Sequence, residues 1–299
     1  MPQIAVFTKN RTNPAYEAAR LGADRVAATF GATTTHYVPE RPDNVEEQIA
    51  LIARAIGERP DAVVLTPVHE SAVNDAILSF DAARIPVVNF VVRSTVGQRL
   101  CFVGSDDRAL AADIAGYLFR TLKGRGNIVI LEGTPASPTS HERLKGFHDV
   151  LAAYPDIRVR ASLCGEYQRD AARKVYAGAA DRLSGIDGVL CANDVMALGV
   201  LDALASSGRE PPPIVGVNAI PEAITAIASG KMLATADFNA MAMSCIATEA
   251  ALRHLRGEAI PREIMLPVQI VDESNCAQWD LPFAERSCPS WQAVTGLPD

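Results

Sequence analysis

Short runs rich in β-branched residues alternate along the chain with longer amphipathic stretches. The runs predict strands, because β-branched residues fit a pleated and buried surface; they are Ile4–Phe7, Thr34–Val38, Ala62–Thr66, Val87–Phe90, Asn127–Leu131, Arg158–Leu163, Val189–Ala192, Ile214–Val217 and Leu233–Ala236. The stretches between them have helical periodicity and include Ala15–Phe30, Val45–Glu58, Ala72–Ala83, Leu110–Leu122, Glu142–Ala153, Ala171–Leu183 and Met196–Ser206. This alternation predicts an α/β fold with parallel sheets covered by helices on both faces.

A weak internal repeat divides the chain into two similar halves. "DAVVLTPVHESAVNDAI" starts at Asp61 and "DGVLCANDVMALGVLDAL" starts at Asp187. Each is an acidic residue, an apolar strand, a polar junction and a helix, and each precedes a further strand that carries an asparagine, Asn89 or Asn218. The repeat predicts two Rossmann-like lobes. Since ligands bind beyond the carboxyl ends of parallel strands, we expect a ligand cleft between the lobes.

Polar and aromatic residues gather where the predicted strands end. Amides and charged groups can pair with hydroxyls, and aromatic faces can pack on sugar rings, so together these residues indicate a carbohydrate-like ligand. For each one alone, a turn, a helix cap or a solvated surface position remains an alternative. The candidates are Lys9, Asn10, Asn13, Tyr16, Thr66, Asn89, Phe90, Arg93, Ser105, Asp106, Arg143, Tyr167, Asn193, Asn218 and Asp237.

The junction "CANDVM" contains two adjacent polar residues, Asn193 and Asp194. Asp194 is expected to cap the following helix by accepting hydrogen bonds from its first amides. Asn193 is the stronger candidate for a ligand contact, because its amide offers both donors and an acceptor.

Composition and charge narrow the function classes. Hydrophobic residues make up 48% and charged residues 21% of the 299 residues, which suits a folded protein of about two domains. The net charge is −7 and no basic block occurs, so a nucleic-acid partner is not expected. Apolar runs are far shorter than the ~20 residues of a membrane span. The start "MPQIAVFTKN" leads directly into a strand with no signal-peptide pattern, which leaves open a cytoplasmic protein or a sequence without its leader.

The sequence contains no recognisable enzyme signature. G-x-S-x-G, H-E-x-x-H, the Walker A loop and G-x-G-x-x-G are all absent, and the five histidines have no metal-ligand spacing. We therefore expect no catalytic residue, metal or cofactor. No two of the six cysteines have C-x-x-C spacing. Cys276 and Cys288 lie in an irregular C-terminal tail, and a disulfide between them in an oxidising compartment remains open.

The sequence resembles the type I periplasmic binding proteins, specifically the ribose-binding-protein-like receptors of carbohydrate ABC transporters. The residues that carry the resemblance are "NPAYEAARLGADRVAATFGA", "DAVVLTPVHESAV", "IPVVNF", "FVGSDDRALAADIAGYL", "SHERLKGF", "ANDVMALGVLDAL", "IVGVNAIPEAITAIASGKMLAT" and "LPVQIVDESN". They cover nearly the whole chain to Asn275. The resemblance implies two lobes joined by three hinge strands: 1–105 plus 239–268, and 106–238 plus 269–299 with the irregular tail.

The resemblance also implies ligand contacts and a role. Contacts are expected at Asn13, Tyr16, Arg143, Tyr167, Asn193 and Asn218, and Phe238 is added where the family usually has glutamine. Other departures are Ala15 in place of an aromatic residue, Val91 and Val92 in place of polar residues, and Asn218 in place of aspartate. These changes disfavour ribose, glucose and galactose. They favour a smaller or less polar polyol, a deoxy sugar or a modified sugar, while Lys9, Arg93 and Arg143 leave an acidic ligand open.

The implied protein is a monomeric periplasmic receptor that delivers its ligand to a membrane permease. A ligand-sensing protein of the same fold is the alternative, either a partner of a chemoreceptor or sensor kinase or the effector domain of a LacI-type repressor. The tail "CAQWDLPFAERSCPSW" fits a transport receptor better than a repressor. An α/β enzyme that uses the cleft is a third and weaker hypothesis.

Overall fold

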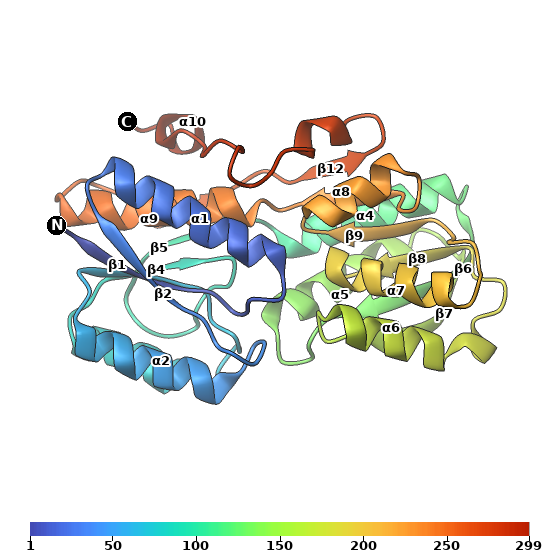
Figure 1. The fold of residues 1–299 in the computed structure, drawn as a ribbon, viewed down its shortest axis with the longest axis horizontal. Helices are drawn as coiled ribbons and strands as arrows, with labels where there is room; N and C mark the ends of the chain where they lie inside the picture. Colours follow the sequence, from blue (N-terminus) through green and yellow to red (C-terminus); the bar gives the residue numbers. More distant parts are fainter. Residues whose placement is uncertain (299) are drawn as a thin grey trace. The chain divides into compact units, whose positions relative to one another are not determined.

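Strands that are parallel with one exception form two six-stranded sheets in the computed structural model of the chain, which describes residues 1–298 (Figure 1). Each sheet belongs to one of two units. The first unit comprises Met1–Ser105, Asn239–Leu266 and the chain from Phe283 onward, and the second comprises Asp106–Phe238 and Pro267–Pro282. This architecture confirms the predicted α/β fold with two parallel-sheet lobes flanked by helices.

In the first unit, helices cover both faces of a sheet with the strand order β11-β5-β4-β3-β1-β2. One face packs on α1 and α9, which lie side by side (Figure 1), and the other on α2 and α3. Alternation along the strands explains this division: Ala5 and Phe7 join the core under α2 and α3. The strands are β1 (Gln3–Phe7), β2 (Thr33–Tyr37), β3 (Ala62–Leu65), β4 (Val87–Phe90), β5 (Arg99–Gly104) and β11 (Glu263–Met265), and the helices are α1 (Pro14–Thr29), α2 (Val45–Glu58), α3 (Asn74–Ala82), α9 (Ala240–Leu255) and α10 (Trp291–Thr295).

The second unit repeats the arrangement with the strand order β12-β10-β9-β8-β6-β7. All its pairings are parallel except that of β10 with β12. Helix α4 packs on the sheet and on α5, while α7 packs on β8, β9 and α6. The strands are β6 (Arg125–Glu132), β7 (Asp156–Cys164), β8 (Gly188–Cys191), β9 (Ile214–Val217), β10 (Ala234–Asp237) and β12 (Gln269–Asp272), and the helices are α4 (Asp107–Thr121), α5 (Pro138–Leu151), α6 (Arg169–Gly178), η1 (Ala180–Arg182), α7 (Asp194–Ser206), α8 (Pro221–Ala228) and η2 (Cys276–Trp279).

The C-terminal segment differs in its assignment from the sequence-based domain boundaries. The prediction placed 269–299 in the second lobe, whereas the chain from Phe283 onward groups with the first unit. The Arg25 guanidinium on α1 donates to the carbonyl oxygens of Ala284 and Arg286, and Trp291 of α10 is buried. The chain therefore passes between the units four times, once more than three hinge strands would require. Among residues 1–298, no helix combines the length and apolarity needed to cross a bilayer.

Candidate functional site

In the second unit, a buried arginine lies at the carboxyl ends of neighbouring strands. Arg143 Nε on α5 lies 2.8 Å from Asp107 Oδ1, and its Nη1 donates to the carbonyl oxygen of Ala192 at 2.7 Å. The guanidinium carbon lies 5.2 Å from the ring centroid of Phe238, which follows β10. Arg143 is only 3% exposed. An ion pair and a backbone acceptor thus fix this cation beside an aromatic ring.

Asp237 is anchored by a residue that sequence reasoning missed. The indole Nε1 of Trp279, in η2, donates to Asp237 Oδ2 at 2.8 Å. The tail sequence gives no sign of this bond, because its two residues are 42 positions apart and meet through the packing of η2 after β12 pairs with β10. This hydrogen bond directs Asp237 Oδ2 toward Trp279 and fixes the orientation of the carboxyl group.

The roles expected for Asn193 and Asp194 are partly exchanged. Asn193 is the N-cap of α7, and its Oδ1 accepts from the backbone amide of Met196 at 2.9 Å. Its Nδ2 approaches the carbonyl oxygen of Tyr167 at 3.5 Å. The expectation that Asp194 caps this helix was wrong. Asn193 has the extended backbone of a cap, with φ −154° and ψ 166°, whereas Asp194 is the first helical residue.

Asp194 instead forms a buried link between α7 and two other segments. Its Oδ1 accepts from Thr235 Oγ1 at 2.6 Å, and its Oδ2 accepts from the backbone amide of Ile220 at 3.1 Å. Burial raises the pKa of the carboxyl to about 7, against the opposing effect of the Thr235 hydrogen bond. Gly216 permits the contact, because a Cβ there would lie 2.2 Å from Asp194 Oδ1.

Tyr167 is held in an unusual backbone conformation beside β6 and β7. Its φ is +57° and that of Glu166 is +54°, a left-handed pair that non-glycine residues seldom adopt and that is often found at functional sites. The phenol oxygen lies 3.3 Å from Thr139 Oγ1. The ring lies on Gly133, where a Cβ would approach Tyr167 Cζ to 2.2 Å. Thr139 lies in the stretch "SPTSHERLKGF", where no sequence pattern marks it as a site residue.

Three predicted site residues carry buried polar atoms without a hydrogen-bond partner among the described residues. They are Asn218 Oδ1 after β9, Thr66 Oγ1 after β3 and Ser105 Oγ after β5. Asn218 also has a φ of +127°. Buried polar atoms are nearly always paired, so each of these atoms indicates capacity for a further hydrogen bond. All three follow the carboxyl end of a parallel strand.

In the first unit, the junction of β1 and α1 concentrates buried polar residues. Asn10 Oδ1 accepts from the Asn13 backbone amide at 3.0 Å, and Asn13 caps α1 by accepting from Ala15 N at 3.0 Å. Asn10, Asn13 and Tyr16 are all less than 9% exposed. Arg20 of α1, which was not predicted, donates to the carbonyl oxygen of Asn10 at 3.3 Å. The junction is therefore rigid and well packed.

Lys9 and Asp43 form the charged part of this junction. Lys9 is 3% exposed, and its carbonyl oxygen accepts from the Asp43 backbone amide at 3.1 Å. Burial raises the pKa of the Asp43 carboxyl, while the Lys9 ammonium and the Asn10 amide oppose that rise. Asn10 Nδ2 donates to Asp43 Oδ2 at 3.2 Å. Asp43 lies in a loop distant in sequence, and no pattern pointed to it.

The candidate residues at the end of β4 and in the loop after it separate into two groups. Asn89 uses its amide on the backbone, donating to Leu65 O at 3.2 Å and accepting from Ser94 N at 3.1 Å, and Phe90 is completely buried. Arg93 is exposed and pairs at 2.5 Å with Glu263 of β11, the strand at one edge of the sheet. The structure thus does not bring Arg93 to the polar junction of Lys9.

Asp106 forms its hydrogen bonds with the backbone of α4 rather than with Arg143. It caps α4 by accepting from the backbone amides of Arg108 and Ala109 at 3.0 and 2.9 Å. The next residue, Asp107, contacts Arg143, so the acid that joins the cluster lies one position later than the prediction. Helical geometry explains the shift, because the cap side chain turns back onto its own amides.

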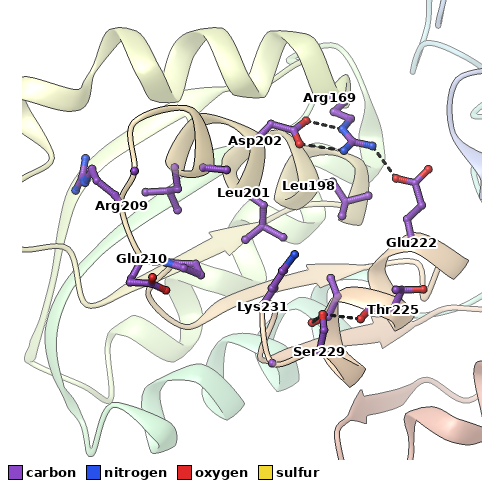
Figure 2. Close-up of a pocket in the computed structure, with 16 residues that line it drawn as sticks. Arg169, Leu198, Leu201, Asp202, Arg209, Glu210, Glu222, Thr225, Ser229 and Lys231 are labelled. Carbon is purple, nitrogen blue, oxygen red and sulfur yellow. Dashed lines mark hydrogen bonds and ion pairs between the residues drawn. The ribbon is translucent and has the colours of Figure 1, made fainter.

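A separate hollow of about 810 Å³ lies in the second unit, between α7 and α8 (Figure 2). Arg169 points toward Asp202 and Glu222, at 2.6 Å from each, and Leu198 and Leu201 of α7 line the wall. The other lining residues come from α7, from α8 and from the segments just before β9 and β10, so the hollow runs along these two helices. None of the predicted site residues lines it. Across residues 1–298, no group of three or more His, Cys, Asp or Glu residues could hold a metal.

Comparisons with known proteins agree with this arrangement. The profile of the periplasmic binding protein domain matches residues 4–259. A xylitol-binding protein of Mycolicibacterium smegmatis is 29% identical over 234 residues, covering 78% of this chain and 67% of that protein. The ribose import binding protein of Salmonella typhimurium is 26% identical over 269 residues, covering 90% of each chain.

A solved structure extends the comparison. The solute binding protein of an ABC transporter from Actinobacillus succinogenes, with bound D-allose, superposes with a TM-score of 0.87 and 28% identity, covering 93% of this chain and 100% of that one. By name, all three relatives are binding proteins rather than enzymes, and the ribose import protein and the D-allose-bound protein belong to transport. The chain therefore belongs to the periplasmic binding protein family, and its predicted likeness to the ribose-binding-protein-like receptors is confirmed.

Proposed function

We propose that the chain is a periplasmic solute-binding protein that captures a small polyol or sugar and delivers it to the permease of an ABC transporter. It acts as a monomer, without turnover and without nucleic acid. The observation that carries the proposal is the set of partnerless polar atoms, Asn218 Oδ1, Thr66 Oγ1 and Ser105 Oγ, at strand carboxyl ends in both units. Hydroxyl groups of a ligand are suitable partners for such atoms.

The Arg143 cluster supports recognition of hydroxyls in the second unit. Asp107 and the Ala192 carbonyl hold the guanidinium in one orientation before any ligand arrives. A pre-oriented group loses little side-chain entropy on binding, so its hydrogen bonds contribute more to affinity. The nearby Phe238 ring offers an apolar face to the carbon side of a sugar or polyol.

The proposed ligand class rests on two positions where this chain departs from the related receptors. Asn218 stands where they usually have aspartate, which removes a charged acceptor, and Phe238 stands where they usually have glutamine, which removes a neutral polar group. An uncharged polyol or a less polar sugar suits this set. The relatives that bind xylitol and D-allose support that class. Closure of the two units around the ligand would complete the site, because a ligand that contacts both favours the closed state.

Transport is favoured over signalling among the roles considered for this fold. The ribose import binding protein and the D-allose-bound solute binding protein of an ABC transporter are by name components of transport. The sensing role, whether with a chemoreceptor or as a repressor domain, is therefore not favoured.

Thermal unfolding of ligand-free protein against a panel of pentitols, pentoses, hexoses and sugar acids tests the proposal. A ligand at 100 times its Kd stabilises the folded state by about 2.7 kcal/mol, which raises Tm by several degrees. Arg143→Lys should lower the affinity for the positive ligand at least about tenfold, because lysine cannot reproduce the planar donor set. The matched change Arg173→Lys, at an exposed ion pair with Asp170, should leave affinity unchanged. No stabilisation by any polyol or sugar would contradict the proposal.

A further inference from the structure

Two cysteines in the first unit lie close enough to react with each other. Cys245 lies on α9 and Cys288 in the C-terminal segment, and their sulfur atoms are 2.7 Å apart. A disulfide needs a sulfur separation of about 2.0 Å, so a small side-chain movement forms the bond. Cys276, the partner considered from the sequence, lies instead in the second unit, where its sulfur contacts the carbonyl oxygen of Glu273 at 3.7 Å.

The surroundings hold the two sulfur atoms together. Gly22 of α1 backs Cys245, and a Cβ at this glycine would lie 2.9 Å from Cys245 Sγ and 2.8 Å from the Met241 carbonyl oxygen. Arg25, one helical turn further, holds the C-terminal segment by donating to Arg286 O at 2.6 Å. Helix α1 therefore positions both the helix that carries Cys245 and the segment that carries Cys288.

The two thiols differ in reactivity. The hydrogen bond from the Cys245 thiol, together with the Arg25 guanidinium, lowers the pKa of Cys288 to about 7, although burial and the Glu249 carboxylate oppose this. The same hydrogen bond, with burial, raises the pKa of Cys245. Cys288 is partly exposed while Cys245 is 1% exposed, so an oxidant reaches Cys288 first.

We propose that Cys245 and Cys288 form a disulfide that fastens the C-terminal segment to α9. The electron acceptor is a dithiol–disulfide oxidant, such as a disulfide-exchange protein or oxidised glutathione. The Cys288 thiolate attacks one sulfur of that disulfide, forming a mixed disulfide and releasing one thiolate. Cys245 then gives up its proton and attacks Cys288 Sγ, and the second oxidant thiolate leaves. Two cysteine thiols are oxidised to one disulfide, and one oxidant disulfide is reduced to two thiols.

The bond closes a covalent loop that contains a passage of the chain through the second unit. Between Cys245 and Cys288 lie the end of α9, β11, and then Pro267–Pro282 with β12 and η2. The chain passes between the units for the fourth time at Pro282–Phe283, and the disulfide then fixes it to the first unit at Cys288. Cross-linking removes freedom from the unfolded chain, and more so for a loop of this length than for a short one.

Oxidation of the full chain with oxidised glutathione, followed by blocking of remaining thiols and non-reducing peptide mapping, tests the pairing. The wild type should lose two of its six thiols and yield a peptide that joins Cys245 to Cys288. Cys276→Ser should behave identically. Cys245→Ser should retain glutathione on Cys288, because the resolving thiol is missing. A joined peptide that contains Cys276, or six intact thiols after oxidation, would overturn the proposal.

A stability measurement separates the bond from a chance contact. The oxidised wild type should unfold at least about 5 °C above the same protein reduced with dithiothreitol. Cys288→Ser, which differs by one atom, should show no redox-dependent shift. An equal Tm for the oxidised and reduced wild type would show that the bond fastens nothing, and would also contradict the proposed role.

Discussion

Asp194 has a completely buried carboxyl group that accepts hydrogen bonds from two other segments. It joins the start of α7 to Ile220, before α8, and to Thr235 of β10. Burial opposes ionisation, so its pKa rises from 3.8 to about 7, with a smaller contribution from the charge of Asp237. The second unit therefore binds a proton at Asp194 that the unfolded chain has released at the same pH.

The pH dependence of stability should report this group. Because the folded pKa lies above the unfolded value, the stabilisation is complete below pH 3.8 and is lost as pH rises through about 7. The loss is on the order of 4 kcal/mol across that window. Asp194→Asn cannot ionise, so the Tm of the wild type minus that of the variant should fall between pH 5 and pH 8. A difference that stays constant or rises over this range would contradict the assignment.

At the same scale, the sequence indicated the junction but not the roles of its residues. "CANDVM" predicted a polar strand-to-helix turn, and the structure has one. Which of two adjacent side chains turns back as the cap depends on backbone angles set by the packing of α7 on β8 and β9, which spacing does not report. The sequence also contains no signal for Asp43 and Trp279, because their contacts join segments that are far apart along the chain.

At the scale of elements, close helix packing in the second unit depends on glycine. Gly199 lies in α7, and a Cβ there would come within 2.2 Å of the Arg169 carbonyl oxygen and 3.1 Å of Ala172 Cβ. Helices α6 and α7 make extensive contact along this line. The partner atom is backbone, so relief requires the helices to separate rather than a side chain to rotate.

Gly199→Ala should therefore destabilise the second unit by roughly 1–3 kcal/mol, despite the better helix propensity of alanine. Gly178→Ala is the matched control, since this glycine ends α6 and a Cβ added there would have no atom within 4 Å. The control should be neutral or gain about 0.5 kcal/mol. Urea unfolding followed by circular dichroism measures both changes, and equal effects of the two substitutions would show that packing does not decide the outcome.

The sequence pattern predicted elements well where periodicity is strong and poorly where tertiary contacts define them. Apolar runs such as Val189–Ala192 correspond closely to a strand, here β8. The edge strands β11 and β12 lie among polar residues and take their pairing from neighbouring strands, so they lacked a local signal. The sequence-based boundary puts the whole C-terminal segment in the second lobe, whereas contacts with Arg25 and α9 group the chain from Phe283 onward with the first unit.

At the scale of the whole molecule, each unit contains one of the two tryptophans. Trp279 belongs to the second unit and Trp291 to the first. Trp291 is 1% exposed, and the guanidinium of Arg253 on α9 lies 4.9 Å from its ring centroid. Arg253 is itself paired with Glu249 and Glu258 at 2.8 Å each. The indole is therefore part of the core that joins α10 to α9.

Trp291→Ala should lower the stability of the first unit by about 3–5 kcal/mol, because a large buried side chain is lost and its cavity collapses only partly. Trp279 is then the sole tryptophan, so its fluorescence reports the second unit while circular dichroism reports both. In urea with reductant, circular dichroism should show a transition at lower denaturant concentration that Trp279 fluorescence does not follow. In the complementary variant Trp279→Phe, the second unit loses the hydrogen bond to Asp237 and Trp291 is the remaining tryptophan, which reports the first unit. The second unit should then unfold first, so circular dichroism should show an early transition that Trp291 fluorescence does not follow. If Trp279 fluorescence shifts together with circular dichroism in Trp291→Ala, the two units unfold as one cooperative body and the separate-unit interpretation is wrong.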